Sequence, residues 1–375
     1  MITGWAPVGD RITDVAGIAV GHHHLVDADA TLGLGGPDDA PGTGWATGTT
    51  VVVVSAPEGA TGAPTAAVDV RGGGPGTRET DLLDPSNTVT TVHAIVLTGG
   101  SAYGLAAADG VMAGLEESGR GLPMNARGGV VPIVPGAVIF DLPMGGWTNR
   151  PDASFGHAAL QAAGVEVAQG SVGAGAGARA GGLKGGVGTA SSRIETGAAS
   201  GITVGALIVA NPVGSVIDPD TGLPWGATDH DLAYYELARP DSSDTARLAD
   251  VAAKQTVLNT TIGVVATDAE LDAASVRRIA MSAHDGLARA IHPVHSPLDG
   301  DTIFAVATGA HPTEPSAFVP AGMNPDVAVL ADICRVAVTV TQRAIVNAVL
   351  AADSVAGVPS YADLAPSAIT TSGIA

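Results

Sequence analysis

The residues best suited to chemistry stand at the head of an apolar run two thirds of the way along the chain. Asn259, Thr260 and Thr261 come directly before the segment 262–265, Ile-Gly-Val-Val, which is typical of a buried strand. A threonine hydroxyl in this place could attack the carbonyl before it, pass through an ester, and be released by water as a new N-terminus. The freed α-amino group would then serve as general base for its own hydroxyl. The alternative is structural, because threonines also satisfy backbone groups at a strand start, and these residues alone favour that alternative.

A glycine-rich run at residues 170–188 holds a second candidate, Lys184, with no acidic residue within ten positions. Such a lysine is either a solvent-facing loop residue or a buried cation with a functional role. The run also contains a Gly-x-Gly-x-x-Ala pattern from Gly173, with Glu195 about twenty residues further on, which is typical of dinucleotide binding. A dinucleotide-dependent enzyme that uses residues 173–195 is therefore an alternative. A tightly packed loop is favoured, because the helix that this alternative requires would be rich in glycine.

Two further groups favour structural roles. His22, His23 and His24 are adjacent, and adjacent residues of a strand point to opposite faces, so the three cannot bind one metal ion. Cys334, the only cysteine, falls on the apolar face of a predicted helix and is expected in the core rather than as a nucleophile. Neither a metal site nor a disulfide within the chain is expected.

The elements that must position these residues alternate between strands and helices, which indicates an α/β protein. Thr267 and Glu270 form a capping-box pattern for the helix after the opening strand. The segment Val130–Phe140 contains two prolines and is predicted to be a broken or edge strand. Strands are predicted at 14–21, 49–54, 65–70, 93–98, 201–210, 262–266 and 301–308. Helices are predicted after Ser101 to about Glu117, at 154–163, through Val276, Ile279, Ala283 and Leu287 before Pro293, and after the cap Asn324-Pro325, with Val327, Leu330, Cys334, Val338, Thr341 and Ile345 inward.

Residues 215–255 differ in character from the segments around them. They contain three prolines and a scatter of aspartates. This composition predicts an exposed, mobile segment that ends immediately before the Asn259-Thr260 stretch.

The amino-acid composition and net charge argue against several classes of protein. Of 375 residues, 46% are hydrophobic, 3% aromatic and 14% charged, so the core is built from small aliphatic side chains and a homo-oligomer is expected. A net charge of -20 without a cluster of Lys and Arg argues against binding to nucleic acid or to an anionic membrane surface. The N-terminal stretch lacks the basic start and apolar run of a signal peptide. A prolyl bond interrupts the apolar stretch 201–217, so a soluble cytoplasmic protein is expected.

Five segments carry a more specific signal when they are taken together. They are VDVRGGGPGTRETDLLDP at 68–85, AIVLTGGSAYGLAAADGV at 94–111, GAGARAGGLKGGVG at 175–188, IVANPVGSVID at 208–218, and LNTTIGVVATD at 258–268 with SPLDGDTIFAV at 296–306. In this order they resemble the DmpA-type L-aminopeptidase/D-amidase/D-esterase family, which includes β-aminopeptidases and the nylon-oligomer hydrolase. The similarity continues through both ends of the chain.

The resemblance implies a fold and a maturation step. The fold would be a four-layer αββα sandwich, similar in architecture to the N-terminal nucleophile hydrolases but with different connectivity. Residues 1–375 would form a single domain that cuts itself into a large chain, 1–259, and a small chain, 260–375. These chains would stay together, in a homo-oligomer expected to be a tetramer of processed heterodimers. No metal and no cofactor would be needed.

The resemblance also implies roles for individual residues. Thr260 matches the nucleophile, and the cut would fall between Asn259 and Thr260. Thr260 and the Asp-Gly-Asp sequence ending at Asp301 resemble the nylon-oligomer hydrolase branch. The other matches are Asn211 with the oxyanion-binding amide, Lys184 with a lysine near the nucleophile, Asp299 and Asp301 with the carboxylates that orient it, and Phe140 and Tyr103 with the substrate-binding region, where Phe140 replaces an active-site tyrosine.

These observations together predict a self-processing amidohydrolase or aminopeptidase with an N-terminal threonine. It would cleave amide bonds of small peptides or peptide-like amides through an acyl-Thr260 intermediate. One alternative is a non-catalytic binding protein on the same fold. The other is the dinucleotide-dependent enzyme that uses residues 173–195.

Overall fold

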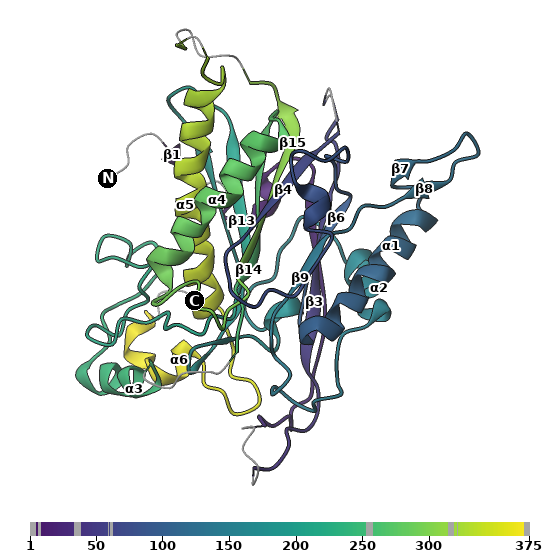
Figure 1. The fold of residues 1–375 in the computed structure, drawn as a ribbon. Helices are drawn as coiled ribbons and strands as arrows, with labels where there is room; N and C mark the ends of the chain where they lie inside the picture. The colour runs from purple at the N-terminus through teal and green to yellow at the C-terminus, as the bar shows by residue number, and fades with distance from the viewer. Residues whose placement is uncertain are drawn as a thin grey trace.

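The fold, a computed structural model, is described for residues 5–6, 9–33, 39–58, 60, 63–252, 258–313, 319–320 and 322–370. It is a mixed α/β protein with two main sheets (Figure 1). The larger sheet has the strand order β1-β12-β13-β14-β15-β4, and the smaller has the order β2-β3-β6-β9-β5. Two short hairpins, β7–β8 and β10–β11, complete the strand pairing among the described residues.

The larger sheet contains the predicted strand that follows Thr260. Its strands β13 and β14 are buried on both faces, which explains their continuous runs of Val, Ile and Ala. Helices α4 and α5 cover one face of this sheet (Figure 1). The strands are β1 (Trp5–Ala6), β12 (Gly186–Ile194), β13 (Thr203–Ala210), β14 (Ile262–Ala269), β15 (Thr302–His311) and β4 (Thr65–Val70), and the helices are α4 (Ala273–Ala290) and α5 (Val327–Leu350).

The smaller sheet packs against α1 and α2 and shares an apolar core with the larger sheet. Val52, Ile95 and Leu97 of the smaller sheet are buried in one cluster with Leu207 and Val264 of the larger. The strands are β2 (Ile18–Val26), β3 (Ala46–Val54), β6 (Ala94–Thr98), β9 (Gly136–Val138) and β5 (Thr77–Arg78). The remaining elements are α1 (Ala107–Glu117), α2 (Ala153–Gln161), α3 (Ser242–Ala252), α6 (Tyr361–Leu364), β7 (Leu122–Pro123), β8 (Val130–Val131), β10 (Arg179–Ala180) and β11 (Leu183–Lys184).

Most predicted elements are confirmed, with shifted ends. The strand predicted at 65–70 has those bounds, and the broken strand at 130–140 divides into β8 and β9. Strand β9 lies between β6 and β5, so this segment is not an edge. The strand predicted at 14–21 begins instead at Ile18, after a single helical turn, and continues through the three histidines.

The capping box predicted from Thr267 and Glu270 is wrong. Thr267 lies inside β14, and its hydroxyl donates to the carbonyl of Thr203 at 3.0 Å. The strand continues through Ala269 because it keeps pairing with β15, and Asp272 caps α4 by accepting from the Ser275 N–H at 2.7 Å. The apolar face of α4 predicted from Val276 to Leu287 is confirmed.

The start of the long helix α5 also differs from the prediction. Helix α5 begins at Val327, and Asn324 closes the turn before it by accepting from the Asp326 N–H at 2.8 Å. Leu330 and Cys334 are only half-buried at the side of the core, because Ile333 and Val336 occupy its centre. Val338, Thr341 and Ile345 are buried as expected, whereas Val327 is half-buried.

The segment 215–255 is not uniformly exposed, contrary to prediction. Val216, Ile217, Leu223 and Leu248 are buried against the larger sheet and its helices, because the proline-bounded turns fold back onto the body. Residues 253–255 lie outside the described residues.

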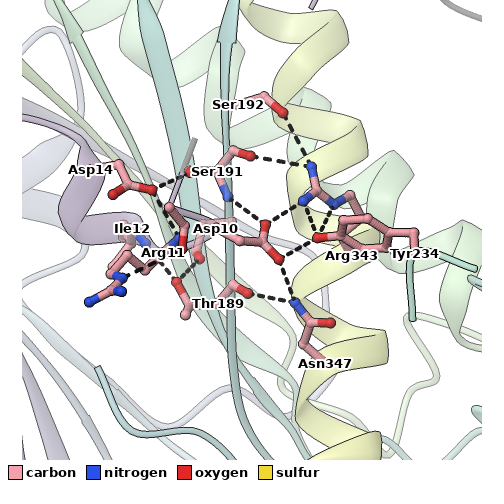
Figure 2. Close-up of polar contacts among 12 residues, drawn as sticks. Asp10, Arg11, Ile12, Asp14, Thr189, Ser191, Ser192, Tyr234, Arg343 and Asn347 are labelled. Carbon is pink, nitrogen blue, oxygen red and sulfur yellow. Dashed lines mark hydrogen bonds and ion pairs between the residues drawn. The ribbon is translucent and has the colours of Figure 1, made fainter. Parts of the chain in front are cut away.

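A polar network connects the N-terminal region to helix α5 (Figure 2). The Arg343 guanidinium forms an ion pair with Asp10 and donates to the Ser191 carbonyl at 3.2 Å. Asn347, one turn further on, donates to the Thr189 carbonyl at 2.8 Å. Because a buried guanidinium is stable only with its partners present, this network fixes α5 against β12.

Candidate active site

The register of β13 and β14 places Thr260 beside Asn211. The antiparallel ladder pairs Val209 with Ile262, so the residues that precede β14 face those that follow β13. The Thr260 N–H donates to the Asn211 carbonyl at 2.7 Å, and the buried Thr260 hydroxyl donates to the carbonyl of Asn259. The hydroxyl therefore contacts the carbonyl group that precedes it.

The two asparagine side chains are held by backbone groups of the same loops. Asn211 accepts from the Arg179 N–H at 2.7 Å, and its amide nitrogen donates to the Phe140 carbonyl at 3.4 Å. Asn259 donates to the carbonyls of Pro212 and Arg179, at 2.7 and 3.2 Å. The long contact leaves the Asn211 amide nitrogen as a donor that a stronger acceptor could recruit.

The parallel pairing of β14 with β15 brings Asp301 to the nucleophile candidate. Ile262 pairs with Thr302, and the Asp301 carboxylate accepts from the Thr261 N–H at 2.8 Å. A Cβ atom on Gly300 would lie 2.9 Å from the Thr260 hydroxyl oxygen, so only glycine allows this loop to approach so closely.

Asp299 precedes this glycine and is buried against the loop that follows β13. Its carboxylate accepts from the Val213 N–H at 3.0 Å. Burial, followed by the nearby Asp301 carboxylate, raises the pKa of Asp299 to about 6. An Asp-Gly pair is also typical of a simple turn, but both aspartates are buried and accept from backbone N–H groups, those of Val213 and Thr261.

Lys184 is fully buried, which excludes the solvent-facing alternative. Its ammonium donates to the carbonyls of Gly175 and Gly185, at 2.6 and 2.9 Å, and among the described residues it donates no hydrogen bond to Thr260. Burial lowers the pKa of Lys184 to about 7, against the opposing influence of Asp141 and Asp353.

Sequence reasoning missed Asp141, which is buried beside this lysine. Its two oxygens accept from the Gly100 N–H and the Thr47 hydroxyl, each at 2.6 Å, and a Cβ atom on Gly99 would lie 2.1 Å from it. Burial raises the pKa of Asp141 to about 6, although Lys184 acts to lower it. The available signal was one carboxylate in the apolar run 138–142, which predicts a partner in the core.

A second missed residue is His295, which lies between Asp301 and the α4 residue His284. Its Nδ1 atom is 2.8 Å from an Asp301 carboxylate oxygen, and the two imidazole rings meet edge to face at 4.8 Å. The signal available in the sequence was a histidine in the segment that leads to Asp299 and Asp301.

A cavity of about 200 Å³ opens onto Thr260. Phe140 lines it and meets Trp147 edge to face at 6.4 Å. Tyr103 is 58% exposed, stacks under the Arg150 guanidinium at 3.8 Å, and is not one of the residues that line this cavity. The remaining lining residues are neutral, and they are Gly74, Pro75, Gly76, Ser101, Ala102, Val138, Leu258, Asn259 and Leu298.

The dinucleotide alternative is wrong, because no helix follows the glycine-rich turn. Residues 173–175 form a single helical turn, after which the chain continues as the β10–β11 hairpin and the long strand β12. The backbone at Gly185, Gly186 and Gly188 lies directly against neighbouring backbone, as expected of a tightly packed loop and strand.

The side chains of the three adjacent histidines contact three different partners. His22 contacts the Thr50 hydroxyl at 2.9 Å and His24 accepts from the Gly173 N–H at 3.2 Å, while His23 meets Phe155 edge to face at 4.8 Å. No group of three or more potential ligand side chains gathers at one point in the described parts of the chain. The described helices also include none with the length and apolar character needed to cross a membrane.

Known proteins similar to this chain include aminopeptidases and an oligomer endohydrolase. The model of peptidase family S58 matches residues 10–361. The chain is 55% identical over 364 residues to an uncharacterized aminopeptidase of Mycobacterium tuberculosis, covering 96% of this chain and 99% of the relative. It is 32% identical over 276 residues to a 6-aminohexanoate-oligomer endohydrolase of Kocuria sp., covering 70% and 69% of the two chains.

Solved structures extend the comparison to the fold. A Burkholderia sp. beta-aminopeptidase superposes with a TM-score of 0.66 at 26% identity, over 96% of this chain and 93% of the other. The L-aminopeptidase D-Ala-esterase/amidase of Ochrobactrum anthropi, a variant of the Ntn hydrolase fold, gives 0.66 at 21% identity, over 94% and 89%. The chain therefore belongs to peptidase family S58, the DmpA family that its sequence resembles, and is a hydrolase.

Proposed function

We propose that this chain is a self-processing amide hydrolase whose nucleophile is Thr260, and that its substrates are small peptides or peptide-like amides. The observation that carries the proposal is the contact between the Thr260 hydroxyl and the carbonyl of Asn259, in a buried site surrounded by Asn211, Asp299 and Asp301. A threonine with a purely structural role at a strand start has no need of this set of buried polar groups.

Self-processing begins with attack of the Thr260 hydroxyl oxygen on the Asn259 carbonyl carbon. The C–N bond between the two residues breaks as the C–O ester forms, and the hydroxyl proton passes to the released amine. Water then hydrolyses the ester, which leaves a carboxylate on Asn259 and a free α-amino group on Thr260. The products are the chains 1–259 and 260–375.

Turnover uses the same hydroxyl with the new amino group as its base. The neutral amine accepts the hydroxyl proton as the oxygen attacks the substrate carbonyl, the amine product leaves, and water releases the acyl group. The Asn211 amide nitrogen, held only by a 3.4 Å contact, stabilises the oxyanion. Asp301 orients the first peptide group, and the buried Lys184 supplies positive potential that favours the neutral amine.

Membership of the family supports a proposal for the substrate and the assembly. The cavity beside Thr260 has a neutral lining that includes Phe140, which suits an uncharged acyl group next to the scissile amide. The fold is a four-layer αββα sandwich in one domain, 1–375, with α4 and α5 on one side and α1 and α2 on the other. The protein functions in the cytoplasm as a homo-oligomer of processed heterodimers, with Tyr103 at the outer margin of the substrate site.

Substitution of the nucleophile tests this function. The active protein is expected to give two bands on a denaturing gel whose masses sum to 36.7 kDa, and the smaller chain is expected to begin Thr-Thr-Ile-Gly. Thr260→Ala should give one full-length, folded, inactive chain, because only the hydroxyl and its methyl group are lost. Thr260→Ser keeps the hydroxyl and should retain processing.

Thr261→Ala is the matched control, since it changes the neighbouring hydroxyl and leaves the proposed nucleophile intact. It should be processed at Thr260. A Thr260→Ala protein that still divides at this bond, or an active wild-type protein that stays in one piece, would contradict the proposal. A processed protein that hydrolyses no amide substrate would favour a binding protein on the same fold.

A further inference from the structure

We propose that His295 is a positioning residue for Thr260 that acts through Asp301; this inference rests on the function proposed above. His295 reaches the nucleophile only through the carboxylate, because no contact joins it to Thr260 in the described part of the chain. An N-terminal residue needs such a restraint once its preceding peptide bond is cut.

The two oxygens of the Asp301 carboxylate contact different residues. One oxygen accepts from the Thr261 N–H at 2.8 Å. The other accepts from the His295 backbone N–H at 3.1 Å and lies 2.8 Å from His295 Nδ1. His295 therefore fixes the rotation of the carboxylate that holds the peptide group immediately after Thr260.

Chain cleavage makes this contact more important. In the intact chain, Thr260 is restrained by peptide bonds on both sides and by its hydrogen bond to the Asn211 carbonyl. After cleavage the link to Asn259 is gone, and the first peptide group carries the remaining covalent restraint. A carboxylate free to rotate would let that group move, and a misplaced nucleophile loses rate even when the substrate binds normally.

The surroundings of His295 are built to hold one ring orientation. The backbone at His295 has φ 55°, in the left-handed region. Its ring packs edge to face on His284, whose Nε2 atom contacts the Asp69 carbonyl at 3.1 Å. The His295 Nε2 atom is buried and has no hydrogen-bond partner among the described residues. A hydrogen on Nδ1, shared with Asp301, is the tautomer that this environment favours.

The experiment compares variants at His295 that keep or remove the donor. His295→Asn retains a donor near the Nδ1 position, and asparagine tolerates the left-handed backbone. His295→Ala removes the donor. The alanine variant should lower kcat and the rate of self-processing by about tenfold, with KM unchanged, and the asparagine variant should recover most of that loss.

Two controls separate positioning from packing and from failure of the proposed function. His284→Leu removes the ring that packs on His295 but leaves the contact with Asp301, so it should lower kcat clearly less than His295→Ala does. Thr260→Ala should abolish processing whatever happens at His295. If it does not, the proposed function fails rather than this inference.

Three results would overturn the inference: wild-type kcat and processing in His295→Ala, no recovery in His295→Asn, or an equal loss in His284→Leu. Folding is checked by thermal melting of each variant. Should His295→Ala not fold, His295→Gln takes its place, because its amide lies one bond too far to reach the same carboxylate oxygen. A glutamine variant as active as the asparagine variant would then refute the positioning role.

Discussion

Buried charge distinguishes Thr260 from an ordinary threonine at the start of a strand. Lys184, Asp299 and Asp301 are all nearly inaccessible to solvent; Lys184 lies in the β10–β11 hairpin, and the two aspartates lie in the loop before β15. Burying an ionised group carries a free-energy cost unless the group is paired or hydrogen-bonded. Three such groups in one region therefore indicate a functional site.

The cost at Asp299 can be measured as a dependence of stability on pH. Its folded pKa, about 6, is above its usual value of 3.8, so between these pH values the folded state binds more protons than the unfolded state. The contribution of Asp299 to the stability of the wild type should therefore fall as pH rises from about 4 to about 6. The asparagine in Asp299→Asn does not titrate. The free energy of unfolding of this variant should therefore rise relative to the wild type by up to about 3 kcal/mol over this window.

Urea unfolding at several pH values checks this expectation. All the proteins compared, including the reference called wild type, carry Thr260→Ala, so that each sample is a single chain. Asp285→Asn, which changes an exposed carboxylate on α4, is the control and should follow the wild-type curve. If the free energies of unfolding of Asp299→Asn and the wild type changed in parallel from pH 4 to 6, folding would not raise the pKa of Asp299.

At the scale of elements, glycines on β12 decide how closely α5 approaches the sheet. A Cβ atom on Gly188 would lie 2.0 Å from the Ala344 carbonyl oxygen and 2.3 Å from the Ala348 nitrogen. One on Gly186 would lie 2.7 Å from the Ala348 carbonyl oxygen. Backbone contacts backbone here, so neither partner can move aside without shifting the whole helix.

Gly188→Ala should therefore lower the free energy of unfolding by roughly 3 kcal/mol or more, because the added methyl group overpacks a rigid contact. Urea unfolding followed by circular dichroism measures the change. Gly164→Ala is the matched control, since a Cβ atom there meets no atom within 4 Å. Similar midpoints for the two variants would show that α5 is held less tightly than this packing implies.

At the scale of the whole molecule, the larger sheet would contain strands from both chains after the proposed cut, and these strands would remain paired. Strand β14, from the small chain, pairs with β13 of the large chain, and β15 pairs with β4. The polar network at α5 joins Arg343 of the small chain to Asp10 of the large chain (Figure 2). Each chain alone would expose sheet edges and a large apolar surface.

The two chains of the processed protein should consequently co-elute in size-exclusion chromatography at high salt, because screening weakens ion pairs but not apolar burial. They should separate only in denaturant. Elution of a free small chain in high salt would show that electrostatic contacts, rather than the shared sheet and core, hold the molecule together.

The sequence by itself predicted the parts of this protein that depend on local pattern. Runs such as 201–210 and 262–266 are largely apolar and indicated buried strands, and the sequence singled out Asn259-Thr260, at the head of one of them, as a candidate site. The five motif segments pointed to the family, and the position of Lys184 in an apolar stretch raised its burial as one of two alternatives.

Tertiary structure decided what depends on residues far apart in the chain. Thr267 continues a strand instead of capping a helix because β15 supplies pairing partners that no local pattern reveals. Asp141 approaches Lys184, and His295 reaches the peptide group after Thr260, only once the two sheets and their loops are packed. A local pattern reports the average preference of a segment, whereas burial, hydrogen bonding and charge are set by neighbours that arrive from elsewhere in the chain.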